Sequence, residues 1–305
     1  MNRLIGTELT NIRVLAEGLS FPEGPVALSD GSVVVVEIGA GRVSRIDTNG
    51  SRATISKVGG GPNGAAVGPD GALYVCNNGG FDKSGTASIQ RVDLDSGKFE
   101  TIYSACDDAL LTAPNDLVFD ATGHFWFTDF GGDALYYAAP DGSRIERAVA
   151  GLAGPNGVGL SPDGKTVYWA QTFTRQVMLR RLSAPGAIIP GQQPYAVMSL
   201  HTGRPLDRDT LLIGLPGAHE LDSLAVDSAG NICVGTLVDA GITVISPDGA
   251  SAELFTLPPA LADGFVTNIC FGGADLKTAY ITCSLTGRLL ACDWPRPGLK
   301  LTYNR

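Results

Sequence analysis

Short oxygen-bearing side chains recur along the chain, each at the start of an apolar run. We call them the head residues. Five are followed by a Gly eight residues later, and the sixth has Leu276 at that position. They are Glu23, Asn63, Asn115, Asn156, Asp222 and Asn268, and neighbours are 40 to 66 residues apart. Carboxylate and amide oxygens are the ligands that hard divalent cations prefer. If the repeats surround an axis, the head residues converge there and form a site for such a cation.

The segments that must position these residues read as short strands. After each head comes an apolar strand such as 117–119, then Asp-Gly or a similar turn pair, then a strand rich in β-branched and aromatic residues such as 125–127. A third, alternating strand follows, and several repeats add a more polar fourth. Six such units predict an all-β fold, a six-bladed β-propeller of four-stranded antiparallel blades. We expect the N-terminal strand, 12–16, to pair with the last blade and close the ring.

The repeats run through the 305 residues without a linker-like break, so we predict a single domain, 1–305. The longest interval between heads contains an insertion at about 183–210, which we expect to form a hairpin or loop over the channel mouth. The six Cys residues have no CxxC spacing, which favours free thiols, with a Cys270–Cys283 pair as the alternative.

Charge and hydropathy limit the partners. The net charge of −9 is diffuse and argues against nucleic acid and anionic membranes. No run approaches the ~20 apolar residues of a membrane span, and the N-terminus lacks the pattern of a signal peptide. We therefore expect a cytoplasmic protein, a monomer or small homo-oligomer, acting on a small-molecule substrate.

Every head precedes the first strand of its repeat, so all heads should lie at one end of the channel. Two carboxylates, Glu23 and Asp222, with the amide oxygens of Asn115 and Asn156, would give a divalent cation oxygen-only ligands and near-neutral charge. For Asn63 and Asn268, turn hydrogen bonds to the backbone are an equal alternative.

Three further residues follow or end second strands on the same face. Asp129 ends such a strand and returns near the heads. Phe130 and Phe173 follow strands that end there, and they form either an apolar substrate wall or part of the core.

Four motifs together resemble one known family, that of gluconolactonase and senescence marker protein (regucalcin). They are PEGP with Glu23, PNDLVFD and FTD with Asn115 and Asp129, GPNGVGLSPDGKTVYWA with Asn156, and LDSLAVDSAGNICVG with Asp222. The resemblance covers essentially the whole chain. It implies a six-bladed propeller with one catalytic divalent metal in the channel, held by Glu23, Asn156 and Asp222, with Asn115 as a fourth ligand or a neighbour of metal and substrate. Ca²⁺ is the expected ion, with Mg²⁺, Mn²⁺, Zn²⁺ and Fe as alternatives.

The resemblance also implies a metal-dependent lactonase, which hydrolyses a cyclic ester. We assign Asp222 as the general base and Asn115 to orienting the substrate, with Asn63, Asp129, Phe130 and Phe173 as further substrate contacts. Two positions depart from the family. Ala113 stands where the mammalian-type sugar lactonases carry Arg, and Phe130 where the bacterial branch tends to carry Pro. Both changes predict a less hydroxylated substrate than gluconolactone.

Two other classes of function stay open. The same metal could serve a hydrolase of another bond, such as an aryl ester or organophosphate, or the protein could be a non-catalytic calcium-binding propeller. Serine catalysis is disfavoured, because the chain has no GxSxG elbow and its three His residues form no recognisable triad.

Overall fold

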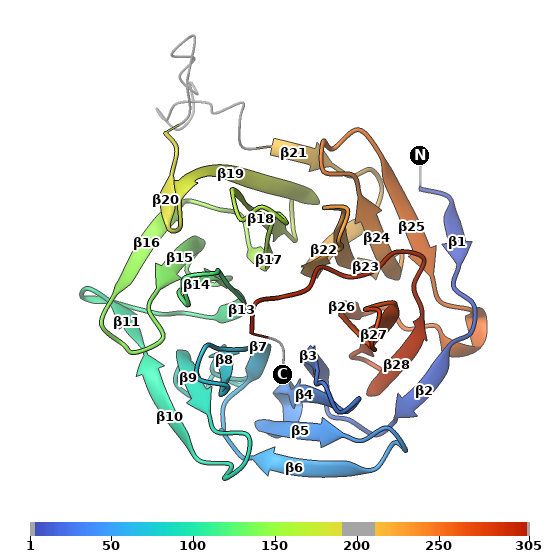
Figure 1. Ribbon diagram of the computed structural model, residues 1–305, viewed down its shortest axis with the longest axis horizontal. Coiled ribbons are helices and arrows are strands. Elements are labelled where there is room, and N and C mark those ends of the chain that lie inside the picture. The colour runs from blue at the N-terminus through green and yellow to red at the C-terminus, as the bar shows by residue number, and fades with distance from the viewer. Residues whose placement is uncertain (1–3, 191–210, 304–305) are drawn as a thin grey trace.

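The computed structural model describes residues 4–190 and 211–303. Six antiparallel sheets are arranged as blades around a central channel (Figure 1), which confirms the predicted six-bladed propeller. The inner strand of each blade begins at or close to its head residue, and the chain then passes outward through the blade. No helix in the described ranges is long and apolar enough to cross a membrane.

The first three blades are regular and contain four strands each. From the channel outward, blade 1 has β3 (Pro22–Ala27), β4 (Val33–Glu37), β5 (Arg42–Ile46) and β6 (Arg52–Ser56). Blade 2 has β7 (Pro62–Val67), β8 (Leu73–Asn77), β9 (Ser88–Val92) and β10 (Phe99–Tyr103). Blade 3 has β13 (Pro114–Phe119), β14 (Phe125–Asp129), β15 (Ala134–Ala138) and β16 (Ile145–Ala150). A small hairpin, β11 (Ala105–Cys106) and β12 (Ala109–Leu110), lies between blades 2 and 3 in sequence.

The last three blades depart from this regular pattern, because additional strands pair with them. Blade 4 has β17 (Pro155–Leu160), β18 (Thr166–Gln171) and β19 (Gln176–Ala184), and both β20 (Ala187–Ile188) and β21 (Leu211–Gly214) pair with β19. Blade 5 has β22 (His219–Val226), β23 (Ile232–Val238), β24 (Gly241–Ile245) and β25 (Ala252–Thr256). Blade 6 has β26 (Val266–Gly272), β27 (Thr278–Cys283) and β28 (Arg288–Asp293). Two short 3₁₀ helices, η1 (Ile38–Ala40) and η2 (Pro259–Leu261), follow β4 and β25.

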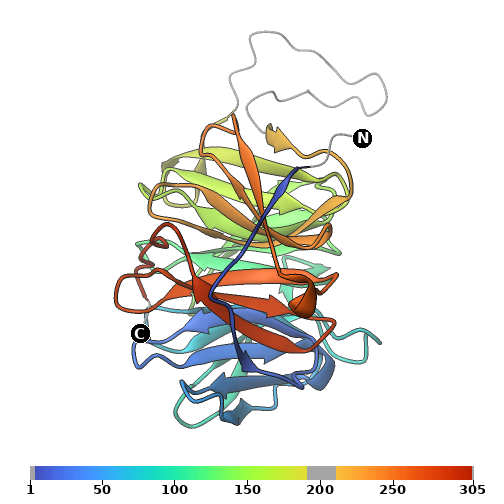
Figure 2. The ribbon, with the colours of Figure 1, turned by 90° about the vertical axis from the view of Figure 1, so that its right-hand side faces the viewer.

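The N-terminus closes the ring. β2 (Arg13–Ala16) pairs antiparallel with β28 as the fourth strand of blade 6, which confirms the sequence prediction. A second strand, β1 (Gly6–Glu8), pairs in parallel with β25 of blade 5, and the sequence analysis did not foresee it. Figure 2 shows the N-terminal segment crossing the outer edge from one blade to the other. The N-terminal segment thus covers two strand edges and ties blades 5 and 6 together.

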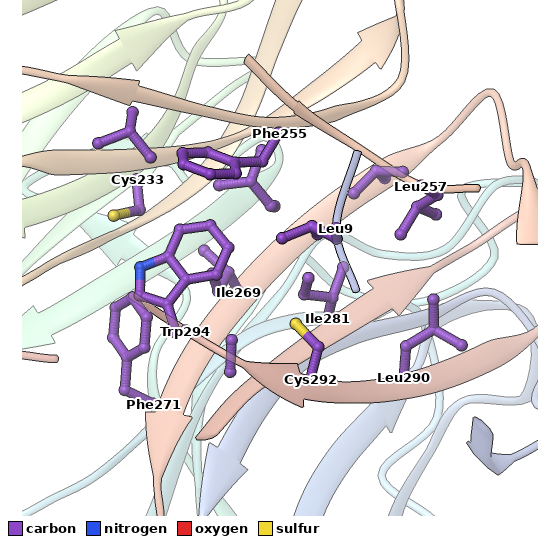
Figure 3. Packing of buried hydrophobic residues seen from close by; sticks show 14 of the residues in the cluster. Leu9, Cys233, Phe255, Leu257, Ile269, Phe271, Ile281, Leu290, Cys292 and Trp294 are labelled. Atoms are coloured by element: carbon purple, nitrogen blue, oxygen red, sulfur yellow. The ribbon is translucent and has the colours of Figure 1, made fainter. Parts of the chain in front are cut away.

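The core is divided among the blade interfaces. In the described part of the chain, six buried apolar clusters lie one at each contact between neighbouring blades. Trp126 and Trp169 pack between blades 3 and 4. Trp294 packs against Phe255 between blades 5 and 6, with ring centroids 5.1 Å apart (Figure 3). All six Cys residues are free thiols, so Cys270 and Cys283 are not paired.

Candidate metal centre

A backbone irregularity marks the head position in every blade. The register between inner and second strand shifts between Glu23 and Val26 in blade 1, and equivalent shifts occur at the inner strands of the other five blades. A β-bulge adds a residue to one strand and re-aims the neighbouring side chain. The irregularities therefore let the head side chains leave the regular alternation of the strand at the end of the channel.

Close contact between inner strands brings neighbouring heads together. Gly24 has φ +50°, and a Cβ placed on it would lie 2.5 Å from the carbonyl oxygen of Asn63 in the next blade. A Cβ on Gly64 would lie 2.5 Å from the carbonyl oxygen of Asn115. Only glycine allows this approach, because any side chain would push the two strands apart. In blades 1 and 2 the glycine after the head thus lets neighbouring inner strands approach closely around the axis.

Glu23 forms the first acidic part of the site and is only 2% exposed. Its Oε2 accepts hydrogen bonds from the backbone N–H of Gly24 and from Nδ2 of Asn268, both at 2.9 Å. Oδ1 of Asn268 in turn accepts the N–H of Ile269 at 2.8 Å. Asn268 therefore orients the Glu23 carboxylate. Asn268 also lines a second cavity, at the opposite end of the channel, which we call the far-end cavity.

Asn156 and Asp222 are linked across the boundary of blades 4 and 5. Nδ2 of Asn156 donates to Oγ1 of Thr172 at 3.2 Å, and that hydroxyl donates to the carbonyl of Leu221 at 2.6 Å. The Asn156 side chain also hydrogen-bonds to Asp222. Thr172 thus positions one head residue against the residue that precedes the next, although sequence reasoning did not single it out.

The charges and amide oxygens of this cluster lack compensation. Within the described residues, Oδ1 of Asn115 and Oδ1 of Asn156 are buried and have no hydrogen-bond donor. Burial raises the pKa of Glu23, and burial together with the nearby charge of Glu23 raises the pKa of Asp222 well above its usual range. Buried acceptors without donors and two mutually repelling carboxylates are costly unless a cation binds there.

The chemistry of the candidate ligand atoms indicates which cation would fit the site. In the described ranges no group of three or more His, Cys, Asp or Glu side chains is arranged to hold a metal. A site here therefore needs the amide oxygens as well as the two carboxylates. Such an oxygen-only set fits Ca²⁺, Mg²⁺ or Mn²⁺ and lacks the nitrogen and sulfur ligands typical of structural zinc.

A further acidic residue lies directly behind the site. Asp116 follows Asn115, and its Oδ1 accepts the N–H of Leu117 at 2.9 Å. Burial, followed by the charge of Glu23, raises the pKa of Asp116 to about 7. It lines the far-end cavity, whereas its neighbour Asn115 lines the cavity at the heads.

Polar side chains at the ends of second strands hold the loops that lead into the heads. Oε2 of Glu37 accepts the N–H of Ser20 at 2.8 Å, Oδ1 of Asn77 that of Gly61 at 2.9 Å, Oδ1 of Asp129 that of Ala113 at 2.6 Å, and Oε1 of Gln171 that of Ala153 at 2.8 Å. Each of these N–H groups lies two or three residues before a head. The four acceptors therefore hold in place the loops that precede four of the six heads.

Asp129 is the predicted substrate contact whose location differs most from expectation. It is completely buried, it is not among the residues that line the head-end cavity, and its oxygens accept the N–H groups of Thr112, Ala113 and Gly132. This places it behind the wall, where it supports the backbone next to Asn115.

A cavity of about 450 Å³, which we call the head-end cavity, opens above the heads. Glu23, Asn63, Asn115, Asn156 and Asp222 line it, so the structure brings together five of the six heads. Ala113, Phe130 and Phe173 line it as well. Sequence reasoning missed Phe21, Phe81 and Phe265 in the wall, because they lie in loops without strand periodicity. Their position close to a head or after a second strand was the available signal.

The predicted insertion is described only over 183–190. Ser183, Ala184 and Pro185 line the far-end cavity, at the opposite end of the channel from the heads. Residues 191–210, on which a cover over the channel mouth would depend, lie outside the described residues. The described part of the insertion therefore does not contribute to the head-end cavity.

His219 lies three residues before Asp222 and is completely buried. Its Nδ1 lies 2.9 Å from Oδ2 of Asp239. This contact joins the first residue of β22 to the loop after β23. The pair belongs to the framework that carries Asp222.

Comparisons with known proteins identify one matching family model, similar sequences and a similar solved structure. The family model described as the SMP-30/Gluconolactonase/LRE-like region matches residues 21–285. A gluconolactonase of Zymomonas mobilis subsp. mobilis is 26% identical, over 90% of this chain and 79% of the relative. Lactonase drp35 of Staphylococcus haemolyticus is 26% identical, over 81% of this chain and 72% of the relative. The solved structure of a calcium-binding regucalcin of Agrobacterium tumefaciens is similar in fold, with a TM-score of 0.73, 17% identity, and coverage of 99% of this chain and 100% of that one.

Proposed function

The chain belongs to the SMP-30/gluconolactonase/LRE-like family, and from this membership we propose that it is a divalent-metal-dependent lactonase. The activity named for its gluconolactonase and lactonase relatives supports hydrolysis of a cyclic ester. The observation that carries the metal part is the pair of buried amide oxygens without donors, Oδ1 of Asn115 and Oδ1 of Asn156, in the described cluster with Glu23 and Asp222.

Four residues would hold the cation: Glu23, Asn156 and Asp222, with Asn115 at or beside them. Ca²⁺ is the ion we propose, because the donors are all oxygens and because a fold neighbour is a calcium-binding protein. When bound, a divalent cation supplies polarisation of the lactone carbonyl and electrostatic stabilisation of the developing oxyanion.

The side chains of the cavity floor would then carry the proton transfers. A water molecule adds to the carbonyl carbon, forming the new C–O bond while a carboxylate oxygen of Asp222 accepts the proton. The ring C–O bond breaks, the departing alkoxide takes that proton, and the product is a hydroxy acid. Asp222 suits this role because it is only half-buried where it lines the cavity, whereas Glu23 is buried and its Oε2 already accepts hydrogen bonds from Gly24 and Asn268.

Two amides would orient the substrate. Asn115 presents its side chain to the cavity beside the proposed ligands, and Asn63 lines the same cavity from blade 2. Precise placement of the carbonyl against the attacking water converts a bimolecular step into an effectively unimolecular one. Asp129 and Thr172 would assist indirectly by fixing the backbone and side chains on which this placement depends.

The test is a substrate panel assayed with and without a chelator. We expect hydrolysis of at least one lactone, its loss on chelation, and its recovery on addition of Ca²⁺, Mg²⁺ or Mn²⁺. Aryl esters and phosphotriesters in the same panel test the alternative bond classes. Calcium binding measured by calorimetry, with no turnover of any substrate in the panel, would contradict the catalytic proposal and favour a binding protein.

A further inference from the structure

The wall of the head-end cavity contains two separate aromatic groups. Phe21, Phe81 and Phe265 come from blades 1, 2 and 6, and we call them the first aromatic wall. Phe130 and Phe173 come from blades 3 and 4, and we call them the second aromatic wall. Blade 1 lies across the ring from blade 4 and blade 6 across from blade 3, whereas blade 2 is next to blade 3 (Figure 1). The two walls therefore line different parts of the cavity.

The first wall is built around Phe21. Its ring packs edge-to-face on Phe81, with centroids 5.0 Å apart, and on Phe265, with centroids 6.1 Å apart. Phe21 has φ +54°, a left-handed conformation that non-glycine residues rarely adopt. Its carbonyl accepts the N–H of Ile38 at 3.1 Å, which holds the residue in this conformation. Such conformations persist where surrounding structure enforces them, often at ligand sites.

The second aromatic wall depends on a glycine that leaves room for its rings. Phe130 and Phe173 pack edge-to-face with centroids 5.4 Å apart. Gly154 lies beneath them, and a Cβ there would come within 2.9 Å of the Phe173 ring. The absence of a side chain at residue 154 is what allows Phe173 to lie over this part of the blade.

Both walls present an aromatic ring to solvent at the mouth. Phe81 is 65% exposed and Phe173 is 62% exposed. An exposed large aromatic ring beside a concave site commonly contacts a ligand, since its burial on binding is favourable. Five of the six head residues form the polar floor of the cavity, and Asn78, Lys83, Thr172 and Glu220 line it as well. Lys83 is the only basic residue that lines this cavity in the described part of the chain, and its Nζ donates to the carbonyl of Asn78 at 3.3 Å.

We infer that the substrate is a lactone with an apolar arm, and that the two aromatic walls grip this arm while the ester lies on the polar floor. This inference rests on the proposed lactonase function and names its substrate class. A polyhydroxylated ring would bury its hydroxyl groups against Phe side chains without partners, which is costly. An alkyl chain or an aryl group shares the required chemistry, and the experiment distinguishes the two.

The experiment measures binding rather than turnover. Lactams replace the ester by an amide that resists hydrolysis, so three δ-lactams serve as probes: one with a hexyl chain, one with a phenyl group and one fully hydroxylated. Calorimetry uses the full-length protein loaded with Ca²⁺. We expect an apolar lactam to bind more tightly than the hydroxylated one, and the better of the two apolar probes identifies the arm as alkyl or aryl.

Variants then locate the contact. Phe81→Ala and Phe173→Ala should each weaken binding of the better apolar lactam about tenfold, because each removes an exposed ring that becomes buried on binding. Phe81→Leu should restore part of the affinity. Phe99→Ala is the matched control, since Phe99 is an exposed Phe on the outer strand β10 of blade 2 and does not line the cavity.

The outcomes separate this inference from the proposed function. Equal or tighter binding of the hydroxylated lactam, no measurable binding of either apolar lactam, or an equal loss in Phe99→Ala, would overturn it even if lactones are hydrolysed. Preferential binding of an apolar lactam that depends on Phe81 and Phe173, in a protein that hydrolyses no lactone, would support the two walls as an apolar site and overturn the hydrolysis alone.

Discussion

The two ends of the channel enclose cavities of nearly equal size that differ in how their polar groups are arranged. The head-end cavity is about 450 Å³ and has carboxylates and amides without donors on its floor. The far-end cavity is about 460 Å³ and is walled largely by apolar residues of the same six inner strands, including Val26, Val158 and Phe271. Cavity volume therefore does not distinguish the two ends. The two ends differ instead in that buried amide oxygens without hydrogen-bond donors converge at the head end.

The far end is also covered by the chain itself. After β28 the C-terminal segment crosses the centre of the ring (Figure 1), and Leu299 to Tyr303 line the far-end cavity. Nε of Arg296 donates to Oδ2 of the buried Asp227 at 2.9 Å, and the N–H of Leu299 bonds to the carbonyl of Val226 at 3.0 Å. The C-terminal segment therefore covers part of this end, whereas in the described part of the chain no comparable segment crosses the head end.

The largest effect that the comparison predicts is on turnover. Asp222→Asn should lower kcat by at least the ~10²–10⁴-fold that general base catalysis contributes, because the proton acceptor and a proposed metal ligand are both lost. Asp163→Asn, at a residue lining the far-end cavity, should leave kcat near the wild-type value. Steady-state kinetics at saturating Ca²⁺ checks both. Near-normal kcat in Asp222→Asn would remove Asp222 from the chemistry.

The next effect is on metal affinity. Glu23→Gln removes one of the two carboxylates, so Ca²⁺ affinity should fall by more than the roughly 10–100-fold typical of losing an outer-shell partner. Glu253→Gln, at an exposed residue of β25, is the matched control and should bind Ca²⁺ as the wild type does. Calorimetric titration measures both variants, and unchanged affinity in Glu23→Gln would contradict the assigned ligand set.

At the far end we predict an effect on stability rather than on activity. Arg296→Ala leaves the buried Asp227 carboxylate without its ion-pair partner and should lower the free energy of unfolding by about 1–3 kcal/mol. Arg288→Ala breaks a pair with the exposed Glu17 and should cost less than about 1 kcal/mol. Denaturant unfolding gives these values. A loss of kcat/KM in folded Arg296→Ala would show that the far end does affect the site.

The smallest predicted change tests the closure of the far end. Cys270 lines the far-end cavity, and burial raises the pKa of its thiol to about 12. The reactive thiolate is then scarce, so a thiol reagent at pH 8 should label Cys270 in the native protein far more slowly than after unfolding. Mass spectrometry of peptides locates the label. Rapid native labelling of Cys270 would mean that the C-terminal segment leaves this end open.

Much of this architecture follows from local patterns. The fold and its six repeats could be predicted because a strand's alternation, its turn residues and the head spacing are all properties of consecutive residues. Ring closure by 12–16 followed from the need to cover an open edge. The parallel pairing of β1 with blade 5 did not, because the segment 6–8 is too short to show a period and its partner is about 250 residues away.

The sequence by itself determined which residues carry side-chain oxygens at the head positions and that these positions recur at one end of every inner strand. Only the tertiary structure decided how they are used, because the bulges and the glycine contacts between blades set the direction of each side chain. Asn63 lines the cavity, while Asn268 donates to Glu23 from behind, although both are Asn at equivalent positions. The aromatic walls likewise exist only in three dimensions, since Phe21, Phe81 and Phe265 come from three blades and meet only when the ring closes.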